Sequence, residues 1–556
     1  MVTRSQSGHR ASTSVFCDPT PTVQFAKTFT DSSLRQRWLF PFLALWGLAF
    51  GLFAVLYSID HAVTGGSGGP SENPVEHYWL FDPEIISNAT SALVGLMAAV
   101  LGIVITVVSI VVQLSANHYS GVASMFLRER VNIIVLGFYI VACILGIWIG
   151  FAVRREFAPR LGIAVMILLT TVGLALMGPY FSYVFRLLEP RSIIARIREE
   201  AITAARAART TKDEAALSAM QSRMVSAFES ITDIASGAIE SRDKVIASQA
   251  IDALEELVLD YLQFKIELPP SWFTLGAGLR RVPAIVALDH ETKFALEQRQ
   301  TWVEWQSMHQ YLGIYRQALG RILEINNLIA IDTRYIAEAA AFADDGPLVR
   351  LTGQFMNSYV RAALNARDVR TTCNVMNQIR LLVETLLNLK RSDEALTLAR
   401  QMNYYGTVAL DMNLPFVTET IAYDLGTLCR RAAQIKFSGE DRLLGILVGK
   451  DELATSSKAV PLGVRKAQAK LAAYYLFEQK PERASLIRDR LRVEPVACLC
   501  AVRDELLLAE HKEYWEIVDR DYNVFEYLTP EHRECLKQFF SWLDEPPAGA
   551  VSPTAQ

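Results

Sequence analysis

The stretch ALVGLMAAVLGIVITVVSIVVQL, residues Ala92–Leu114, decides the fold class of this protein. It carries no charged side chain. A helix of about 20 residues, rising about 1.5 Å per residue, is long enough to cross a hydrocarbon core about 30 Å thick. The stretch therefore predicts a membrane-spanning helix.

Three further apolar runs surround this one. The chain is 51% hydrophobic over 556 residues, which is high for a soluble protein and low for a transporter that spans the membrane throughout. The apolar excess lies before Arg186, whereas the later sequence has ordinary soluble composition. We therefore expect a four-helix transmembrane domain over 35–187, with an outer loop over 59–91. Its helices are expected at 38–58, 92–114, 131–153 and 161–183.

Basic residues near the ends of these runs predict the orientation. They precede the first run, lie in the second connection and follow the fourth run, whereas the connection 60–91 contains none. Arg154, Arg155 and Arg160 oppose this pattern but are fewer. Both termini are therefore expected in the cytoplasm. The residues on the cytoplasmic side are Arg35, Arg37, Arg128, Arg130, Arg186, Arg191, Arg196 and Arg198.

A stripe of small and polar residues follows one face of the second run and continues beyond it. The spacing of its members matches the helical repeat, so they share a face, while the other faces carry Val, Ile and Leu. One interpretation is close packing between neighbouring helices. The other is a hydrated path or a shared oligomer axis, because polar side chains in a membrane face protein or water. The stripe consists of Gly95, Gly102, Thr106, Ser109, Gln113 and Asn117.

Other membrane segments also carry structural signals. Gly47 with Gly51, and Ala142 with Gly146 and Gly150, recur at intervals of four and indicate close helix contacts. The pair Gly178-Pro179 predicts a kink or an early end of the fourth helix. No acidic or basic residue lies inside any of the four runs, which argues against a proton-coupled pump.

The remaining chain, 188–545, is helical in pattern. PRSIIARIREEAITAARAART, 190–210, is expected to continue from the fourth membrane helix. The segments 382–402 and 470–491 each predict helix, short polar turn and helix, similar to tetratricopeptide hairpins. Because no sustained internal repeat is apparent, we expect an irregular α-helical bundle or solenoid. The tails 1–34 and 546–556 are expected to be disordered.

No residue set amounts to a catalytic, cofactor or metal site. A net charge of -4 argues against a nucleic-acid binder. Cys498 and Cys500 have the wrong spacing for a zinc or redox motif, and His532 with Cys535 lacks a second ligand pair. We therefore expect no enzyme activity, no cofactor and no bound metal.

The segment SIVVQLSANHYSGVASMFLRERVNIIVLGFYI, Ser109–Ile140, resembles a family of bacterial predicted membrane proteins, domain of unknown function 2254. The resemblance extends from about Asn88 to Arg198. Members often carry an Asn-Asp-Pro signature in the soluble part, where only Asp243 corresponds in this chain. The resemblance implies a bacterial inner-membrane location and supplies no activity.

Two functions follow as hypotheses. The first is a structural or signalling protein, anchored in the lipid bilayer, whose cytoplasmic helical domain binds another protein. The alternative is a homo-oligomeric, channel-like protein in which the second transmembrane helix lines the axis.

Overall fold

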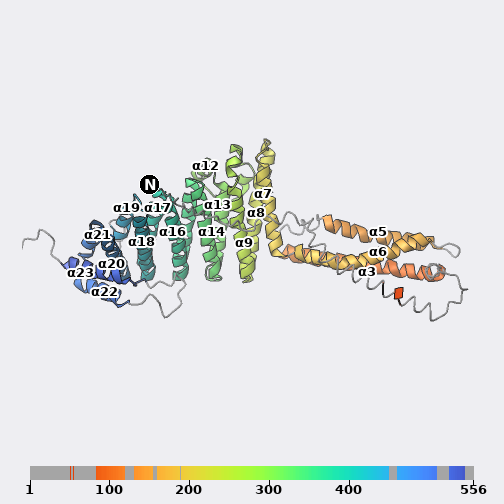
Figure 1. Cartoon of the computed structure of the whole chain (residues 1–556). Coiled ribbons are helices and arrows are strands. Elements are labelled where there is room, and N and C mark those ends of the chain that lie inside the picture. Colours follow the sequence, from red (N-terminus) through yellow and green to blue (C-terminus); the bar gives the residue numbers. More distant parts are fainter. Residues whose placement is uncertain are drawn as a thin grey trace, which may run out of the picture. The chain divides into compact units, whose positions relative to one another are not determined.

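The computed structural model describes residues 51, 54–55, 83–118, 130–153, 159–187, 189–449, 460–509 and 525–544. Every regular element in these ranges is a helix (Figure 1). The expected all-α class is confirmed. The helices belong to two compact units, one holding α3 up to Gln113 together with α5 and α6, and the other holding α7 to α23.

Three long apolar helices form the described part of the first unit. They match the second, third and fourth predicted spans, and α3 begins at Pro83, a residue that suits the first helical position. The first predicted span, 38–58, lies outside the described residues except for Gly51, Ala54 and Val55. The described residues thus include three candidate membrane helices, and the fourth helix stays a prediction. They are α3 (Pro83–His118), α5 (Arg130–Ala152) and α6 (Arg160–Leu187).

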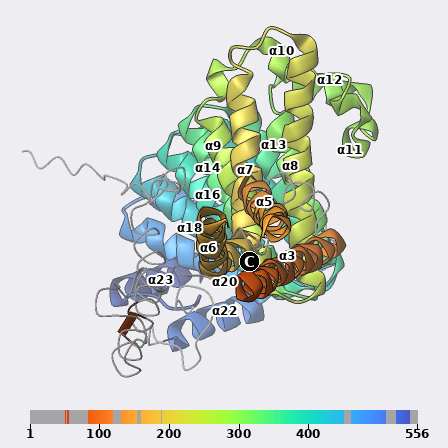
Figure 2. The ribbon, with the colours of Figure 1, turned by 90° about the vertical axis from the view of Figure 1, so that its right-hand side faces the viewer.

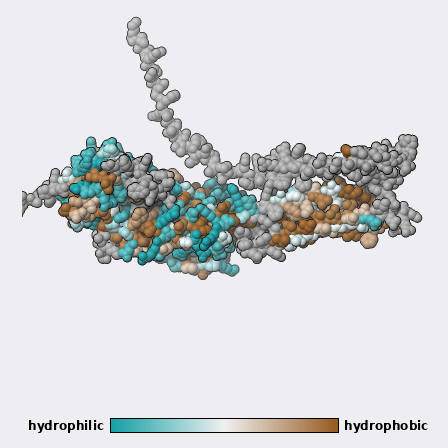
Figure 3. All heavy atoms as spheres, turned by 90° about the horizontal axis from the view of Figure 1, so that it is seen from below, coloured by the Kyte–Doolittle hydropathy of each residue, from teal (hydrophilic) through white to brown (hydrophobic). Residues whose placement is uncertain are grey.

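The outer surface of this unit is apolar. Large side chains such as Ile134, Phe151 and Leu168 are more than half exposed on it. Figure 3 shows hydrophobic residues gathered over these helices, while hydrophilic residues cover much of the other unit. Exposed hydrophobic surface of this extent is typical of helices that face lipid.

The helix α6 does not end early at Pro179. It continues to Leu187, and Tyr180 and Val184 beyond the proline are buried. The Tyr180 hydroxyl donates a hydrogen bond to Oδ1 of Asn132 in α5 at 3.3 Å. A proline removes only one backbone donor, so contacts on both sides of it can hold one continuous helix.

The helix α7 is separate from α6, contrary to expectation. Glu189 is extended, with φ -60° and ψ 122°, and α7 begins at Pro190. The residue before a proline avoids helical backbone angles, whereas proline itself suits the first helical position. The pair Glu189-Pro190 therefore ends one helix and begins the next.

The second unit is a solenoid of stacked helices (Figure 1). Its longer helices form two layers, and within each layer consecutive members contact each other. The first layer contains α9 (Lys244–Leu262), α14 (Leu323–Phe342), α16 (Val369–Asn388), α18 (Pro415–Gln434) and α20 (Leu462–Phe477). The second layer contains α8 (Glu214–Glu240), α13 (Trp302–Ala318), α15 (Gly346–Asn365), α17 (Ser392–Asp411) and α19 (Glu440–Val448).

Short helices occupy an irregular connection between α9 and α13. Figure 2 shows α10, α11 and α12 grouped beside α8. They are η1 (Lys265–Glu267), α10 (Pro270–Phe273), η2 (Leu279–Arg281), α11 (Pro283–Val286) and α12 (His290–Gln298). The remaining helices are α7 (Pro190–Ala207), which packs on α8 and α9, and the last three, α21 (Pro481–Leu491), α22 (Val496–Leu508) and α23 (Pro530–Asp544).

A regular repeat lies in the middle of the solenoid, contrary to the expectation that none is sustained. Each helix from α14 to α18 has 20 residues, and turns of three residues join them. In each turn one residue has a positive φ, between 54° and 60°, and these residues recur every 23 positions. They are Asp344, Arg367, Lys390, Asn413 and Lys436. The two hairpins expected over 382–402 and 470–491 are confirmed as α16–α17 and α20–α21.

The same backbone bonds close each of these turns. The residue after the positive φ donates its N–H to the carbonyl five residues back, as from Arg391 to Leu386 O at 2.9 Å and from Leu414 to Ala409 O at 2.9 Å. This is the Schellman ending of a helix. At Asp345 and Asp368 the same residue also caps the next helix with its side chain. One short turn therefore ends one helix and starts the next.

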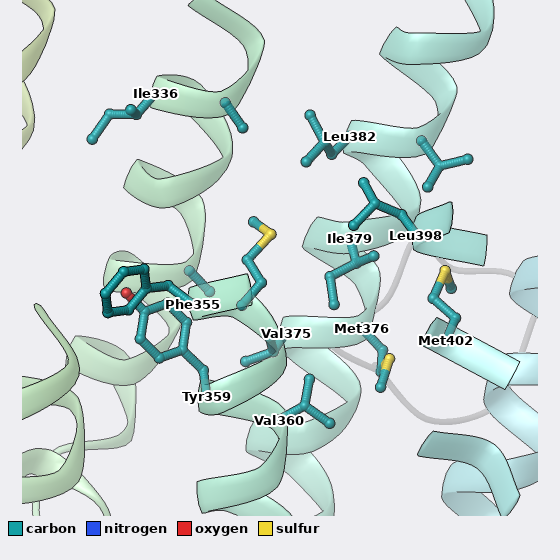
Figure 4. Packing of buried hydrophobic residues seen from close by; sticks show 14 of the residues in the cluster. Ile336, Phe355, Tyr359, Val360, Val375, Met376, Ile379, Leu382, Leu398 and Met402 are labelled. Atoms are coloured by element: carbon teal, nitrogen blue, oxygen red, sulfur yellow. The ribbon is translucent and has the colours of Figure 1, made fainter. Parts of the chain in front are cut away.

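The apolar core follows the same period. Met356, Ile379, Met402 and Leu425 recur every 23 residues and are at most 1% exposed. Figure 4 shows Ile379 and Met402 pointing into the space between neighbouring helices. Each helix therefore buries the same face in two layers of neighbours, which is how a solenoid builds a continuous core.

The positive φ of Lys390 predicts a stabilising substitution. Glycine adopts this region without the strain that a side chain adds, so we expect Lys390→Gly to raise the free energy of unfolding by about 0.5–1 kcal/mol. Lys390→Val is expected to lower it by about 1–2 kcal/mol, because branching at Cβ increases the strain. Thermal unfolding of the two full-length variants measures both effects. A loss of stability in Lys390→Gly would contradict the assignment of this turn.

Candidate functional site

The predicted stripe lies on the exposed face of α3. Gly95, Gly102, Thr106 and Ser109 are exposed, and no other atom comes within 4 Å of a Cβ placed on either glycine. The Thr106 hydroxyl donates to Gly102 O of the same helix at 2.8 Å. Gln113 and Asn117 belong to α3, but their side chains lie outside the described residues.

The opposite face of α3 makes the close contacts inside the unit. A Cβ on Gly146 of α5 would lie 2.4 Å from Cγ2 of Val94 in α3, and one on Gly173 of α6 would lie 3.2 Å from Cε of Met97. Met97 is fully buried. The described helices therefore pack through residues other than the stripe, and both interpretations of the stripe stay predictions.

The small residues of α5 divide between two roles. Ala142 and Gly146 are buried against neighbouring helices, whereas Gly150 is exposed with nothing within 4 Å of its Cβ position. Tyr139 also faces inward, and its hydroxyl donates to Gly173 O at 2.7 Å. The turns of α5 that carry Ala142 and Gly146 thus pack closely against neighbouring helices, as the spacing of these residues indicated.

A ladder of polar side chains connects the first layer of the solenoid. Nε of Arg334 donates to Oε1 of Gln378 at 2.8 Å, linking α14 to α16. One double repeat later, Nε of Arg380 lies 3.6 Å from Oδ1 of Asp424, linking α16 to α18. Each arginine also pairs within its own helix, Arg334 with Glu338 at 2.8 Å and Arg380 with Glu384 at 2.7 Å. The ladder therefore repeats every 46 residues.

Three carboxyl groups lie close together between α9 and α14. Burial, then the neighbouring Glu255 and Asp252, raises the pKa of Asp332 to about 8. Burial and Asp252 raise the pKa of Glu255 to about 7, although Arg334 lowers it. The Tyr311 hydroxyl lies 3.3 Å from Oδ2 of Asp332. This cluster holds protons at neutral pH.

A buried ion pair fixes the irregular connection to the two layers. Nζ of Lys265 lies 2.6 Å from Oε1 of Glu304, which is fully buried, and 2.8 Å from Oδ2 of Asp345. Burial lowers the pKa of Lys265, but the two carboxylates together raise this pKa by more than burial lowers it, so the net shift is upward. Sequence reasoning missed this triad because its members are far apart in the chain and belong to no motif.

Asp243, the one residue that corresponds to the Asn-Asp-Pro signature of the family, caps a helix. Its side chain accepts a hydrogen bond from the N–H of Ile246 at 3.1 Å at the start of α9. Asp213 and Asp289 cap α8 and α12 in the same way. Among the described residues no three His, Cys, Asp or Glu side chains, the three carboxyl groups between α9 and α14 included, are placed so that they could hold a metal ion.

Comparison with known families agrees with these apolar helices. Residues 35–244 match the family model DUF2254, described as a predicted membrane protein. The resemblance stated from the sequence is confirmed and extends beyond both of its expected limits. The DUF2254 match includes α3 to α8 and ends at the first residue of α9, before most of the solenoid. No curated protein and no solved structure matches the chain.

Proposed function

We propose that this membrane protein is a scaffold whose solenoid lies in the cytoplasm and binds another protein. The observation that carries the proposal is the two-layer stacking of helices with a 23-residue period. Stacked helical repeats present an extended surface to which each repeat contributes in turn, and such surfaces typically bind proteins. The first layer is favoured as the binding face because the polar ladder follows it.

The location is part of the same proposal. The arginines that flank the membrane segments favour both termini, and hence the solenoid, in the cytoplasm. The family resemblance favours a bacterial inner membrane. Helix α7 is the next helix in the chain after α6, so on this orientation the solenoid lies on the cytoplasmic side of the membrane.

Two exposed tyrosines allow a matched test. Tyr335 of α14 in the first layer and Tyr404 of α17 in the second layer are each 45% exposed. We expect a photo-crosslinking phenylalanine analogue at position 335 to capture one specific protein in living cells, and the same analogue at position 404 to capture much less. Equal capture at both positions, or capture of many unrelated proteins, would refute the first layer as the binding face.

A second candidate is a channel-like homo-oligomer in which α3 lines the axis. The exposed stripe favours it, because Thr106 and Ser109 point away from the described neighbours of α3. We expect Ser109→Val together with Gln113→Leu to reduce ion flux into liposomes if this candidate is correct. Unchanged flux would remove it and leave helix packing as the role of the stripe.

A further inference from the structure

In the first layer of the solenoid, an arginine of α14 and an arginine of α16 pair with carboxylates, and this pattern changes at α18. Arg334 has Glu338, and Arg380 has Glu384 and Asp424, within 4 Å. Glu338 and Glu384 occupy equivalent positions, 46 residues apart. Another 46 residues on, the equivalent position in α18 is Arg430. The third copy therefore has a cation where the first two have an anion.

A second cation lies beside Arg430 on the next helix of the layer. Lys470 of α20 is partly buried, as is Arg430. Nζ of Lys470 donates to Phe525 O at 2.7 Å, and Nη2 of Arg430 donates to Oγ1 of Thr427 at 3.1 Å. Neither forms an ion pair with any carboxylate in the described part of the chain. Lys466, one turn earlier, by contrast pairs with Glu505 and Glu526.

Each of the two positive charges makes the charged form of the other side chain less favourable. Burial and the charge of Arg430 lower the pKa of Lys470 to about 8, although Glu526 raises it. His532 of α23 is a third nitrogen group that interacts with both cations, and burial, Arg430 and Lys470 lower its pKa more than Glu531 and Glu478 raise it. Its Nε2 is buried and has no hydrogen-bond partner among the described residues. Three partly buried nitrogen side chains thus come from helices that contact one another in turn, α18, α20 and α23, and burial disfavours the charged form of each, an arrangement that a bound anion would stabilise.

We propose that Arg430, Lys470 and His532 form an anion site that binds a carboxylate from an acidic segment of the partner protein. This proposal rests on the proposed function and names the chemistry of its partner. Carboxylate is favoured because the arginines of the same layer already pair with Glu and Asp. Guanidinium also donates two parallel hydrogen bonds to a carboxylate.

The test measures thermal unfolding of the full-length protein with and without a hexaglutamate peptide. We expect the peptide to raise the melting temperature of the wild-type protein and a hexalysine peptide to have no effect. Arg430→Gln and Lys470→Gln should each weaken peptide binding about tenfold or more, since each removes a charged partner.

A second readout separates a binding role from a structural one. Without peptide, Arg430→Gln should keep or raise the melting temperature, because it relieves repulsion with Lys470. The matched control Arg380→Gln should lower it, because the charged contacts of Arg380 with Glu384 and Asp424 are lost, and should leave peptide binding unchanged. A lower melting temperature in Arg430→Gln would overturn the site.

Two further results would also overturn the proposal. Stabilisation by hexaglutamate that persists in the Arg430→Gln, Lys470→Gln double variant would place the peptide elsewhere. Stabilisation by inorganic phosphate and not by the peptide would refute carboxylate as the ligand. If the peptide binds as expected but crosslinking at position 335 captures no protein, the site stands and the proposed function fails.

Discussion

Asp332→Asn is expected to stabilise the protein increasingly as the pH rises from about 4 to 8. Asp332 is 2% exposed, and its pKa in the folded protein is about 8, against 3.8 ordinarily. Between these values the unfolded chain releases a proton that the folded chain keeps, so folding stability falls with rising pH. The slope contributed by one such group is at most about 1.4 kcal/mol per pH unit. Asparagine does not ionise and removes this loss.

The measurement is the thermal unfolding of both full-length proteins at several pH values. We expect nearly equal stability at pH 4 and an advantage for the variant of about 2–4 kcal/mol at pH 8, which stays constant above that. Glu324→Gln is the matched control, because Glu324 is exposed and forms a surface ion pair with Lys244 at 2.9 Å. An advantage for Asp332→Asn that does not vary with pH would contradict the account.

The second large effect is expected in the membrane unit, from Gly146→Leu. Even a Cβ at this position would lie 2.4 Å from Cγ2 of Val94 and 2.9 Å from Cε of Met166. Both α3 and α6 would have to move away from α5. Overpacking of this kind typically costs about 1–3 kcal/mol, and a leucine adds three more carbon atoms. We expect the folded yield in mild detergent to fall severely.

Gly150→Leu provides the control for this prediction. It lies one turn along the same helix, with nothing within 4 Å of its Cβ position. The two variants add the same side chain to the same helix, so helix propensity and hydrophobicity change equally. Size-exclusion chromatography and thermal unfolding should separate them clearly. Similar behaviour of the two would mean that α5 does not pack on α3 and α6 through Gly146.

Local sequence signals predicted most of the membrane unit. Apolar runs predicted the positions of α3, α5 and α6 to within a few residues in their apolar parts. These signals did not predict which small residues pack against another helix. Gly146 and Gly150 belong to the same series of small residues at intervals of four, and they differ only in whether a neighbouring helix faces them. The continuation of α6 through Pro179 depended on tertiary contacts with α5 that no local signal carries.

The 23-residue repeat escaped sequence reasoning for a physical reason. Its turns place Asp, Arg, Lys and Asn at the positive φ, so the glycine that usually marks such a helix ending is missing. Its core positions are buried in every repeat, but the residue type changes from repeat to repeat, as Met356, Ile379, Met402 and Leu425 show. The period is therefore a property of helix length and turn geometry. Arg430, which forms no ion pair among the described residues, stands out only once this period aligns it with Glu338 and Glu384.

Native mass spectrometry of the full-length protein, released from native membranes in mild detergent, tests the scaffold function most directly. The account predicts one or two copies of the chain bound to a second, specific protein. It also predicts that Arg430→Gln reduces the amount of this complex. A closed ring of three or more copies without another protein would contradict the scaffold and favour the axis lined by α3.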